Sequence, residues 1–121
     1  PTILEMTGSE LHPEQHVDGI SLLPLLENKK RTERDAVYWH YPHYSNQGGR
    51  PSGAIRMGNY KLLQFYDTGE VELYDLSIDL SEKKNLKDEK PEVTQELLKK
   101  LNDWRKSVGA DMPVKNTKIY D

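Results

Sequence analysis

The polar stretch between Pro42 and Pro51 carries the side chains in this sequence that are best suited to chemistry. Imidazole, phenol, amide and guanidinium groups fall within about ten residues, and together they can hydrogen-bond sugar hydroxyls and an anionic group. Polar loops are also common where nothing binds, so a purely solvent-exposed loop stays open as the alternative. The residues concerned are His43, Tyr44, Ser45, Asn46, Gln47 and Arg50.

Two histidine pairs have spacings that can suggest a metal site. His40 and His43 are three residues apart, but residues three apart on a strand point to opposite faces, and Pro42 would end the strand between them. His12 and His16 have the i, i+4 spacing of a helix but lie in a segment without a helical pattern. We therefore expect no metal site in this chain.

Composition and motifs argue against a free-standing enzyme. The chain has no cysteine, and the Gly-x-Ser-x-Gly pattern of a serine nucleophile is absent. The 17 basic and 20 acidic residues are interspersed, with a net charge of −3, so nucleic acid is not an expected partner. No apolar run approaches the roughly 20 residues of a membrane span. We expect no catalytic residue within the chain.

The elements that must position the polar stretch are short strands. Residues 36–41 are mainly β-branched or aromatic, which favours a strand. Two further strands are expected at about 53–57 and 60–66, joined at Gly58 and Asn59, and a last one at about 70–75 after a three-residue connection. This pattern predicts a four-stranded antiparallel sheet.

These turns predict a register for the sheet. Arg56 should face Lys61, and Lys61 should face Asp75, so Asp75 or another acid must neutralise the two cations. The same register places Ala54, Leu63 and Leu73 on one side of the sheet and Ile55, Leu62 and Tyr74 on the other. Both sides are then partly apolar.

One long helix is predicted at 91–108, with an apolar stripe at helical spacing. A short N-terminal helix should end at Gly8, and residues 27–35 should form a surface loop. One helix covers one side of a sheet. The other side is either solvated or, in the alternative, presents Ile55, Leu62 and Tyr74 to a body outside this chain. The predicted fold class is α+β, a four-stranded antiparallel β-sheet packed against one long C-terminal α-helix, with a short N-terminal helix.

Three segments in this order and spacing resemble the C-terminal subdomain of a type I sulfatase, an arylsulfatase-like and formylglycine-dependent family. They are residues 39–44 (Trp-His-Tyr-Pro-His-Tyr), 54–63 and 72–76. The likeness extends over nearly the whole chain, so residues 1–121 are expected to be a single domain cut from a larger α/β enzyme. The Cys-x-Pro-x-Arg segment of that family is absent, since the chain has no cysteine.

The resemblance implies how labour is divided in the complete protein. The formylglycine nucleophile and a Ca²⁺ ion (Ca2+) would belong to an N-terminal catalytic domain, the partner of this chain in the same polypeptide. This subdomain would form a wall of the substrate pocket and add stability, and would be inactive alone. A sulfated small molecule or glycan would bind through His43 first, then Asn46, Gln47 and Arg50, with His40 in support.

The resemblance further implies a periplasmic or secreted protein. A second reading of the same residues is an independent carbohydrate- or polar-ligand-binding module without catalytic activity. The coding sequence upstream of Pro1 discriminates between the two, because only the first reading requires a continuous reading frame with the nucleophile motif.

Overall fold

The computed structural model describes residues 1–29, 34–114 and 116 of the chain. They form two compact units, Pro1–Asp35 and Ala36–Asp121, and each is described by itself. The middle of the surface loop predicted at 27–35, residues 30–33, lies outside the described residues. A single domain over 1–121 stays a prediction.

The first unit contains two short helices. Helix α1 spans Thr2–Met6 and helix α2 spans Leu23–Leu26. Gly8 follows α1 with φ +68°, a conformation that glycine adopts without strain, and this agrees with the predicted end of the helix. The Thr2 hydroxyl accepts a hydrogen bond from the Leu22 N–H at 2.9 Å. This bond links the two helices.

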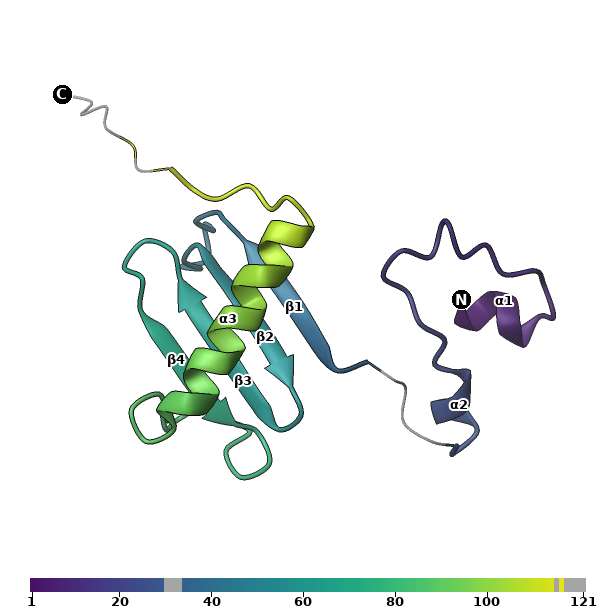
Figure 1. Cartoon of the computed structure of the whole chain (residues 1–121), viewed down its shortest axis with the longest axis horizontal. Helices are drawn as coiled ribbons and strands as arrows, with labels where there is room; N and C mark the ends of the chain where they lie inside the picture. The colour runs from purple at the N-terminus through teal and green to yellow at the C-terminus, as the bar shows by residue number, and fades with distance from the viewer. Residues whose placement is uncertain (30–33, 115, 117–121) are drawn as a thin grey trace. The chain divides into compact units, whose positions relative to one another are not determined.

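The second unit is an antiparallel sheet with one helix. Strands β1 (Ala36–Tyr41), β2 (Ser52–Met57), β3 (Tyr60–Phe65) and β4 (Val71–Asp75) lie in the order β1-β2-β3-β4. Helix α3 (Pro91–Ser107) lies across one face of this sheet (Figure 1). The predicted α+β class is therefore confirmed, with strand ends that differ from the predicted ones by one residue. Among the described residues, no helix is long and apolar enough to cross a membrane.

The core lies between the sheet and α3. Ile55, Leu62 and Leu73 sit opposite one another on neighbouring strands and are fully buried. From the helix, Leu97 and Leu101 pack on them and are also fully buried. The alternative in which Ile55 and Leu62 face another body is therefore wrong, because α3 itself covers them.

Aromatic stacking extends this core toward β1. The rings of Tyr38 and Trp104 lie 4.9 Å apart and nearly parallel, an arrangement that adds about 0.5–1.5 kcal/mol beyond the area it buries. Val108, which the predicted apolar stripe included, is 52% exposed and caps the end of α3. The buried stripe thus ends one turn earlier than predicted.

The register between β3 and β4 differs by one residue from the prediction. Arg56 pairs with Lys61 as expected, but Lys61 pairs with Tyr74 and not with Asp75. Because side chains alternate along a strand, this shift moves Leu73 to the face under α3 and Tyr74 to the opposite face. The predicted placing of both residues was wrong.

The cause of the shift is the length of the β3–β4 connection. The Phe65 N–H donates to the Glu70 carbonyl at 2.9 Å, and the Gly69 N–H donates back to Phe65 at 2.8 Å. The connection therefore holds four residues, 66–69, and not three. Gly69 has φ +75°, which closes this longer turn.

A different acid neutralises the predicted pair of cations. The Lys61 ammonium donates to the Glu82 carboxylate at 2.7 Å, and both side chains are about two-thirds or more buried. Glu82 lies in the segment between β4 and α3 and has φ +54°, which is uncommon for a residue other than glycine. The requirement for an acid is confirmed, with Glu82 in the place of Asp75.

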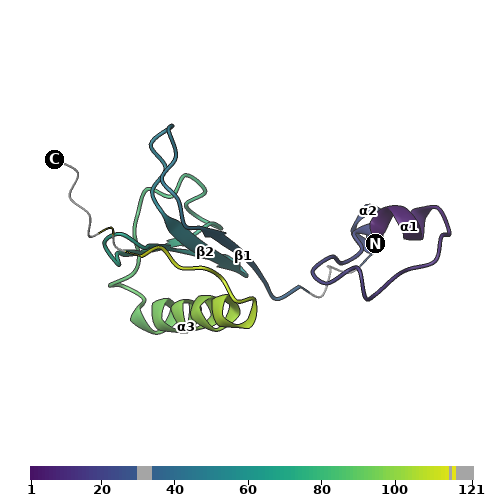
Figure 2. The same ribbon diagram turned by 90° about the horizontal axis from the view of Figure 1, so that it is seen from above.

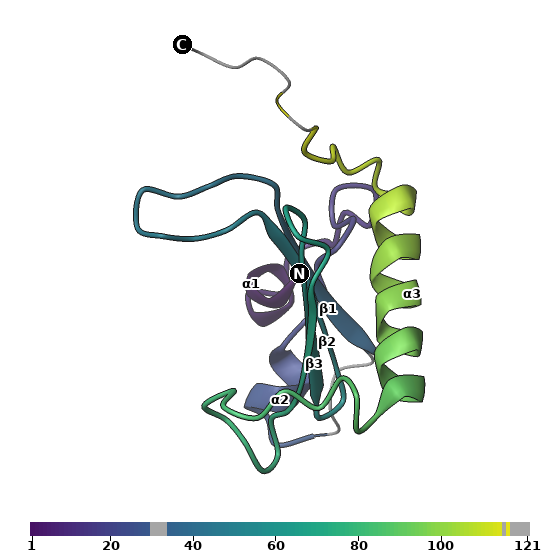
Figure 3. The ribbon, with the colours of Figure 1, turned by 90° about the vertical axis from the view of Figure 1, so that its left-hand side faces the viewer.

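The side of the sheet away from α3 is called the open face; it carries Trp39, Tyr41, Ala54, Leu63 and Tyr74. The loop between β1 and β2 bends toward this side, away from α3 (Figures 2 and 3). Trp39 and Tyr41 are 49% and 47% exposed. A hollow of about 400 Å³ lies here, lined by residues that include Trp39, Leu63 and Glu82.

The opposite end of the open face is sealed by the chain itself. Tyr74 is buried and its hydroxyl donates to the Glu72 carboxylate at 3.0 Å. Burial, followed by this carboxylate, raises the pKa of Tyr74 to about 12. The open face is therefore accessible at β1 and closed at β4.

Candidate functional site

The candidate site begins at the tip of the loop 42–51. The Ser45 N–H donates to the Gly49 carbonyl at 3.0 Å, and the Gly49 N–H donates to the Ser45 hydroxyl at 2.9 Å. Gly48 closes the turn with φ +88°. Asn46 and Gln47 stand at this closed tip with exposed side chains. Ser45 therefore shapes the loop, while the two amides face solvent.

Arg50 anchors the loop to the β3–β4 connection. Its guanidinium donates to both oxygens of Asp67, at 2.9 and 3.1 Å, and lies 3.3 Å from Glu70. The same group lies 4.3 Å above the Phe65 ring, and the Tyr44 hydroxyl donates to Asp67 at 3.3 Å. Two carboxylates already offset the Arg50 charge, so the main effect of Arg50 is to hold the loop in place.

The Arg50–Asp67 pair predicts a measurable titration. Hydrogen bonding from Arg50 is the largest cause that holds the pKa of Asp67 below the ordinary value of 3.8 for this side chain. A lowered folded-state pKa means that the pair stabilises the fold above about pH 4, and that this contribution is lost as pH falls through the folded value. Arg50→Gln should raise the Asp67 pKa, which carbon-detected NMR of the carboxyl group measures.

The control for this titration is Arg56→Gln. Arg56 is exposed on the open face, and it pairs with Lys61 at the end of β2 that lies away from the β3–β4 connection. That substitution should leave the Asp67 pKa where it is. An Asp67 pKa that stays low in the Arg50→Gln variant would show that the loop is held by other contacts.

His43 lies at the side of the loop nearest the segment that follows α3. Its ring meets Tyr41 edge to face at 5.6 Å, and the side chain is exposed. A wide shallow pocket of about 540 Å³ is lined by His43 and Tyr44 together with residues that include Met112 and Pro113. Of the site residues proposed from the sequence, His43 lines this pocket.

His40 is committed to structural hydrogen bonds. Its Nε2 lies 2.8 Å from the Asp111 carbonyl, which can only accept, so Nε2 carries the proton and donates. In the neutral ring, Nδ1 then accepts from the Tyr66 hydroxyl at 2.7 Å. Gly53 makes this contact possible, because a side chain at that position would collide with the Tyr66 hydroxyl. His40 thus fixes the segment that lines the His43 pocket.

Metal ligands do not gather in the described part of the chain, where no group of three or more His, Cys, Asp or Glu side chains could hold an ion. Both ring nitrogens of His40 are already used. The residues that the structure describes therefore do not fit a calcium site.

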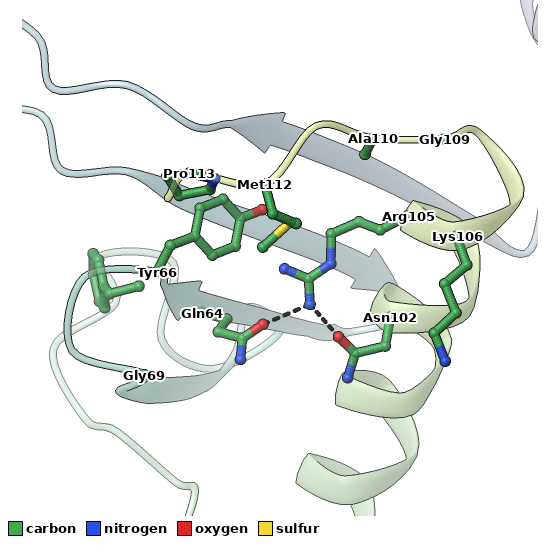
Figure 4. Close-up of a pocket in the computed structure, with 11 residues that line it drawn as sticks. Gln64, Tyr66, Gly69, Asn102, Arg105, Lys106, Gly109, Ala110, Met112 and Pro113 are labelled. Carbon is green, nitrogen blue, oxygen red and sulfur yellow. Dashed lines mark hydrogen bonds between the residues drawn. The ribbon is translucent and has the colours of Figure 1, made fainter. Parts of the chain in front are cut away.

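A second pocket, of about 390 Å³, involves residues that sequence reasoning missed (Figure 4). Arg105 of α3 is only 6% exposed and donates to the Gln64 side-chain oxygen at 2.6 Å and to the Asn102 side-chain oxygen. Its guanidinium carbon lies 5.2 Å from the Tyr66 ring centre. The pocket is thus built around a buried cation.

The sequence did contain a signal for Arg105. It continues the four-residue spacing of Leu97 and Leu101, so it falls on the buried stripe of α3. A charged residue at a core position of a helix is unusual and indicates a special role for its side chain.

The fold and the loop together define a small α+β subdomain with one partly open sheet face. The chain belongs to the family described as N-sulphoglucosamine sulphohydrolase, C-terminal, whose model matches residues 1–107. The resemblance to the C-terminal subdomain of a sulfatase is thereby confirmed. Members of this family are sulfatases, that is, sulfuric ester hydrolases, and the chain corresponds to their C-terminal part.

Curated relatives agree with this assignment. The chain is 35% identical over 112 residues to a sulfatase of Formosa agariphila, covering 84% of this chain and 20% of the relative. It is 34% identical over 120 residues to an N-acetylglucosamine-6-O-sulfatase of Bacteroides thetaiotaomicron, covering 93% and 21%. The chain therefore spans about a fifth of the length of these relatives.

A solved structure shows the same fold with similar sequence. It is described as BT4656 in complex with its substrate D-glucosamine-2-N,6-O-disulfate, and it matches with a TM-score of 0.74 and 33% identity. The match covers 93% of this chain and 24% of the other. The fold observed here is thus the fold found in part of that larger protein.

Proposed function

We propose that this chain is the C-terminal part of a sulfuric ester hydrolase, arylsulfatase-like, that acts on sulfated carbohydrates. The observation that carries the proposal is the family match over residues 1–107 together with coverage of only about a fifth of the matched sulfatases. The sulfated glucosamine bound by one structural relative supports a sulfated sugar as substrate. In this proposal the chain supplies a pocket wall and stability, and not the nucleophile.

Substrate contact is proposed for the exposed side chains of the loop. His43 is the first candidate, followed by Asn46 and Gln47, because all three are exposed on one loop that stands clear of α3. Arg50 would contact a sulfate only by giving up bonds to the carboxylates that hold it, so its effect on binding is mainly to position the loop. His40 supports this arrangement through the segment after α3.

The partner proposed for the open face is an N-terminal catalytic domain of the same polypeptide. Trp39 and Tyr41 are large, half-exposed aromatic side chains on this face, and exposed apolar surface of this kind commonly marks an interaction site. The Ca²⁺ ion and the formylglycine would belong to that domain, since this chain has no cysteine and its described residues contain no fitting group of acids. A periplasmic or secreted location is proposed on the family resemblance alone.

The coding sequence upstream of Pro1 tests this proposal directly. A continuous reading frame that contains Cys-x-Pro-x-Arg supports it. A start codon immediately upstream would instead favour an independent carbohydrate-binding module, and binding of sulfated sugars by the isolated chain would then be its expected property.

The isolated 121-residue chain is expected to show no sulfatase activity. It has no cysteine from which the nucleophile could form, so added Ca²⁺ should make no difference. The measurement is hydrolysis of an aryl sulfate by purified protein with and without the ion. Turnover above a matched blank, retained through repeated purification, would contradict the division of labour proposed here.

A further inference from the structure

The cavity around Arg105 is not explained by the function proposed above. Among the described residues, its lining includes two cations, Arg105 and Lys106, and no carboxylate. Arg105 is 6% exposed, and the acceptors of its hydrogen bonds are the neutral amides of Gln64 and Asn102. A buried charge without an opposite charge lowers the stability of the fold. The presence of such a charge therefore suggests that it interacts with a group from outside the described residues.

One terminal nitrogen of Arg105 differs from the other in its hydrogen bonding within the described part of the chain. Nη1 is buried and has no hydrogen-bond partner among the described residues. The Tyr66 hydroxyl lies beside the guanidinium: burial raises its pKa, and hydrogen bonding and charge from Arg105 act to lower it. This hydroxyl donates to His40, and it makes no hydrogen bond of normal geometry with Nη1. Buried donors are almost always satisfied in folded proteins, so this one points to an acceptor that comes from outside the described part of the chain.

Acids near the cavity are already occupied or lie elsewhere. Asp67 and Glu70 flank Gly69 on the neighbouring turn, and both pair with Arg50. Asp111 lines the neighbouring His43 pocket and not this one. Within the described residues, the charge of Arg105 therefore has no internal carboxylate to meet it.

We propose that this cavity is an oxyanion-binding site that takes a sulfate or carboxylate group between Arg105 and Lys106. Nη2 already donates to Gln64 and Asn102, so Nη1 is the guanidinium nitrogen that can donate to such a group. The exposed Lys106 adds a second positive charge at the entrance. Met112 lines the cavity (Figure 4) and is 47% exposed. Its unbranched side chain can change rotamer and so admit the ligand to Nη1.

Two sources of the anion share this chemistry, a free oxyanion and a charged substituent of a sugar. Met112 and Pro113 line both this cavity and the pocket that contains His43. A sulfated sugar can therefore reach the loop as well as Arg105, whereas inorganic sulfate would occupy the cavity alone.

The test is an NMR titration of the ¹⁵N-labelled 121-residue chain with sodium sulfate, against sodium chloride at equal ionic strength. Saturable shifts are expected for the side-chain amides of Gln64 and Asn102 and for the Gly109 backbone amide. Arg105→Met should abolish the saturation, and Lys106→Ala should weaken binding about threefold, as for a partly exposed ion pair. Lys100→Ala, on the same helix but outside the cavity lining, is the matched control.

Failure of these shifts to saturate with sulfate would overturn the proposal, as would equal affinity in wild type and Lys106→Ala. The lysine variant decides the matter even if Arg105→Met does not fold, because Lys106 is exposed. Glucosamine 6-sulfate, with N-acetylglucosamine as the uncharged control, then identifies the source. Shifts at both Arg105 and His43 assign a sugar substituent, and shifts at the cavity alone assign a free oxyanion. Because the assay reads binding only, its failure leaves the proposed sulfatase function untouched.

Discussion

Leu62→Ala is expected to lower the free energy of unfolding of this chain by about 2–5 kcal/mol, the range for a leucine truncated in a packed core. Leu62 is fully buried between Ile55 and Leu73 and beneath Leu97 and Leu101. Small domains have only about 5–15 kcal/mol in total, so much of the chain's stability would be lost. Urea unfolding followed by circular dichroism measures the change.

The neighbouring substitution Leu63→Ala is the matched control. It removes the same atoms one position along β3, but from the open face, where Leu63 is only partly buried. We expect a loss below about 1 kcal/mol, since partly exposed positions lose little transfer free energy. Equal losses at the two positions would show that this face is as tightly packed as the one under α3.

In the complete enzyme proposed above, His43→Ala should reduce kcat/KM on a sulfated sugar about 10- to 100-fold, the equivalent of one hydrogen bond to a charged group. Stability should hardly change, because His43 is exposed and its one ring contact is an edge contact with Tyr41. Steady-state kinetics and urea unfolding of the same preparation separate the two effects.

His12→Ala is the control for that experiment, since His12 is an exposed histidine outside the loop. It should leave both kinetics and stability unchanged. If His43→Ala folds normally and keeps full activity, His43 does not contact the substrate, and the amides of Asn46 and Gln47 become the remaining candidates on the loop.

Local patterns in the sequence were sufficient for the elements of the fold. Gly58 and Asn59 form a two-residue turn, which correctly sets the pairing of Arg56 with Lys61. At the next turn, three or four loop residues are equally compatible with Gly69 at a left-handed position. The hydrogen bonds between Phe65 and Glu70 select four. Since one residue of slip reverses the faces of a strand, this small ambiguity misplaced a whole strand.

The candidate functional site was less predictable than the fold, because its polar side chains form hydrogen bonds with residues far away in the sequence. Composition identified the loop that carries Arg50, but the opposing carboxylates come from another turn, 17 and 20 residues later. Arg105 meets Gln64 across 41 positions, and His40 meets Asp111 across 71. Such contacts depend on the register of the strands and on the position of α3 against the sheet. A local sequence pattern predicts neither of these.

The absence of a side chain at Gly53 constrains which residues can occupy positions far from it in the sequence. Tyr66 passes over it to reach His40, and His40 in turn holds the backbone at Asp111. In a homologue with a side chain at position 53, the tyrosine at position 66 must adopt another orientation. Its hydrogen bond to the histidine at position 40 is then lost. Substitutions at positions 40, 53 and 66 should consequently co-vary among homologues. These three positions can therefore be used to group distant homologues by whether they keep the hydrogen bond between the histidine and the tyrosine.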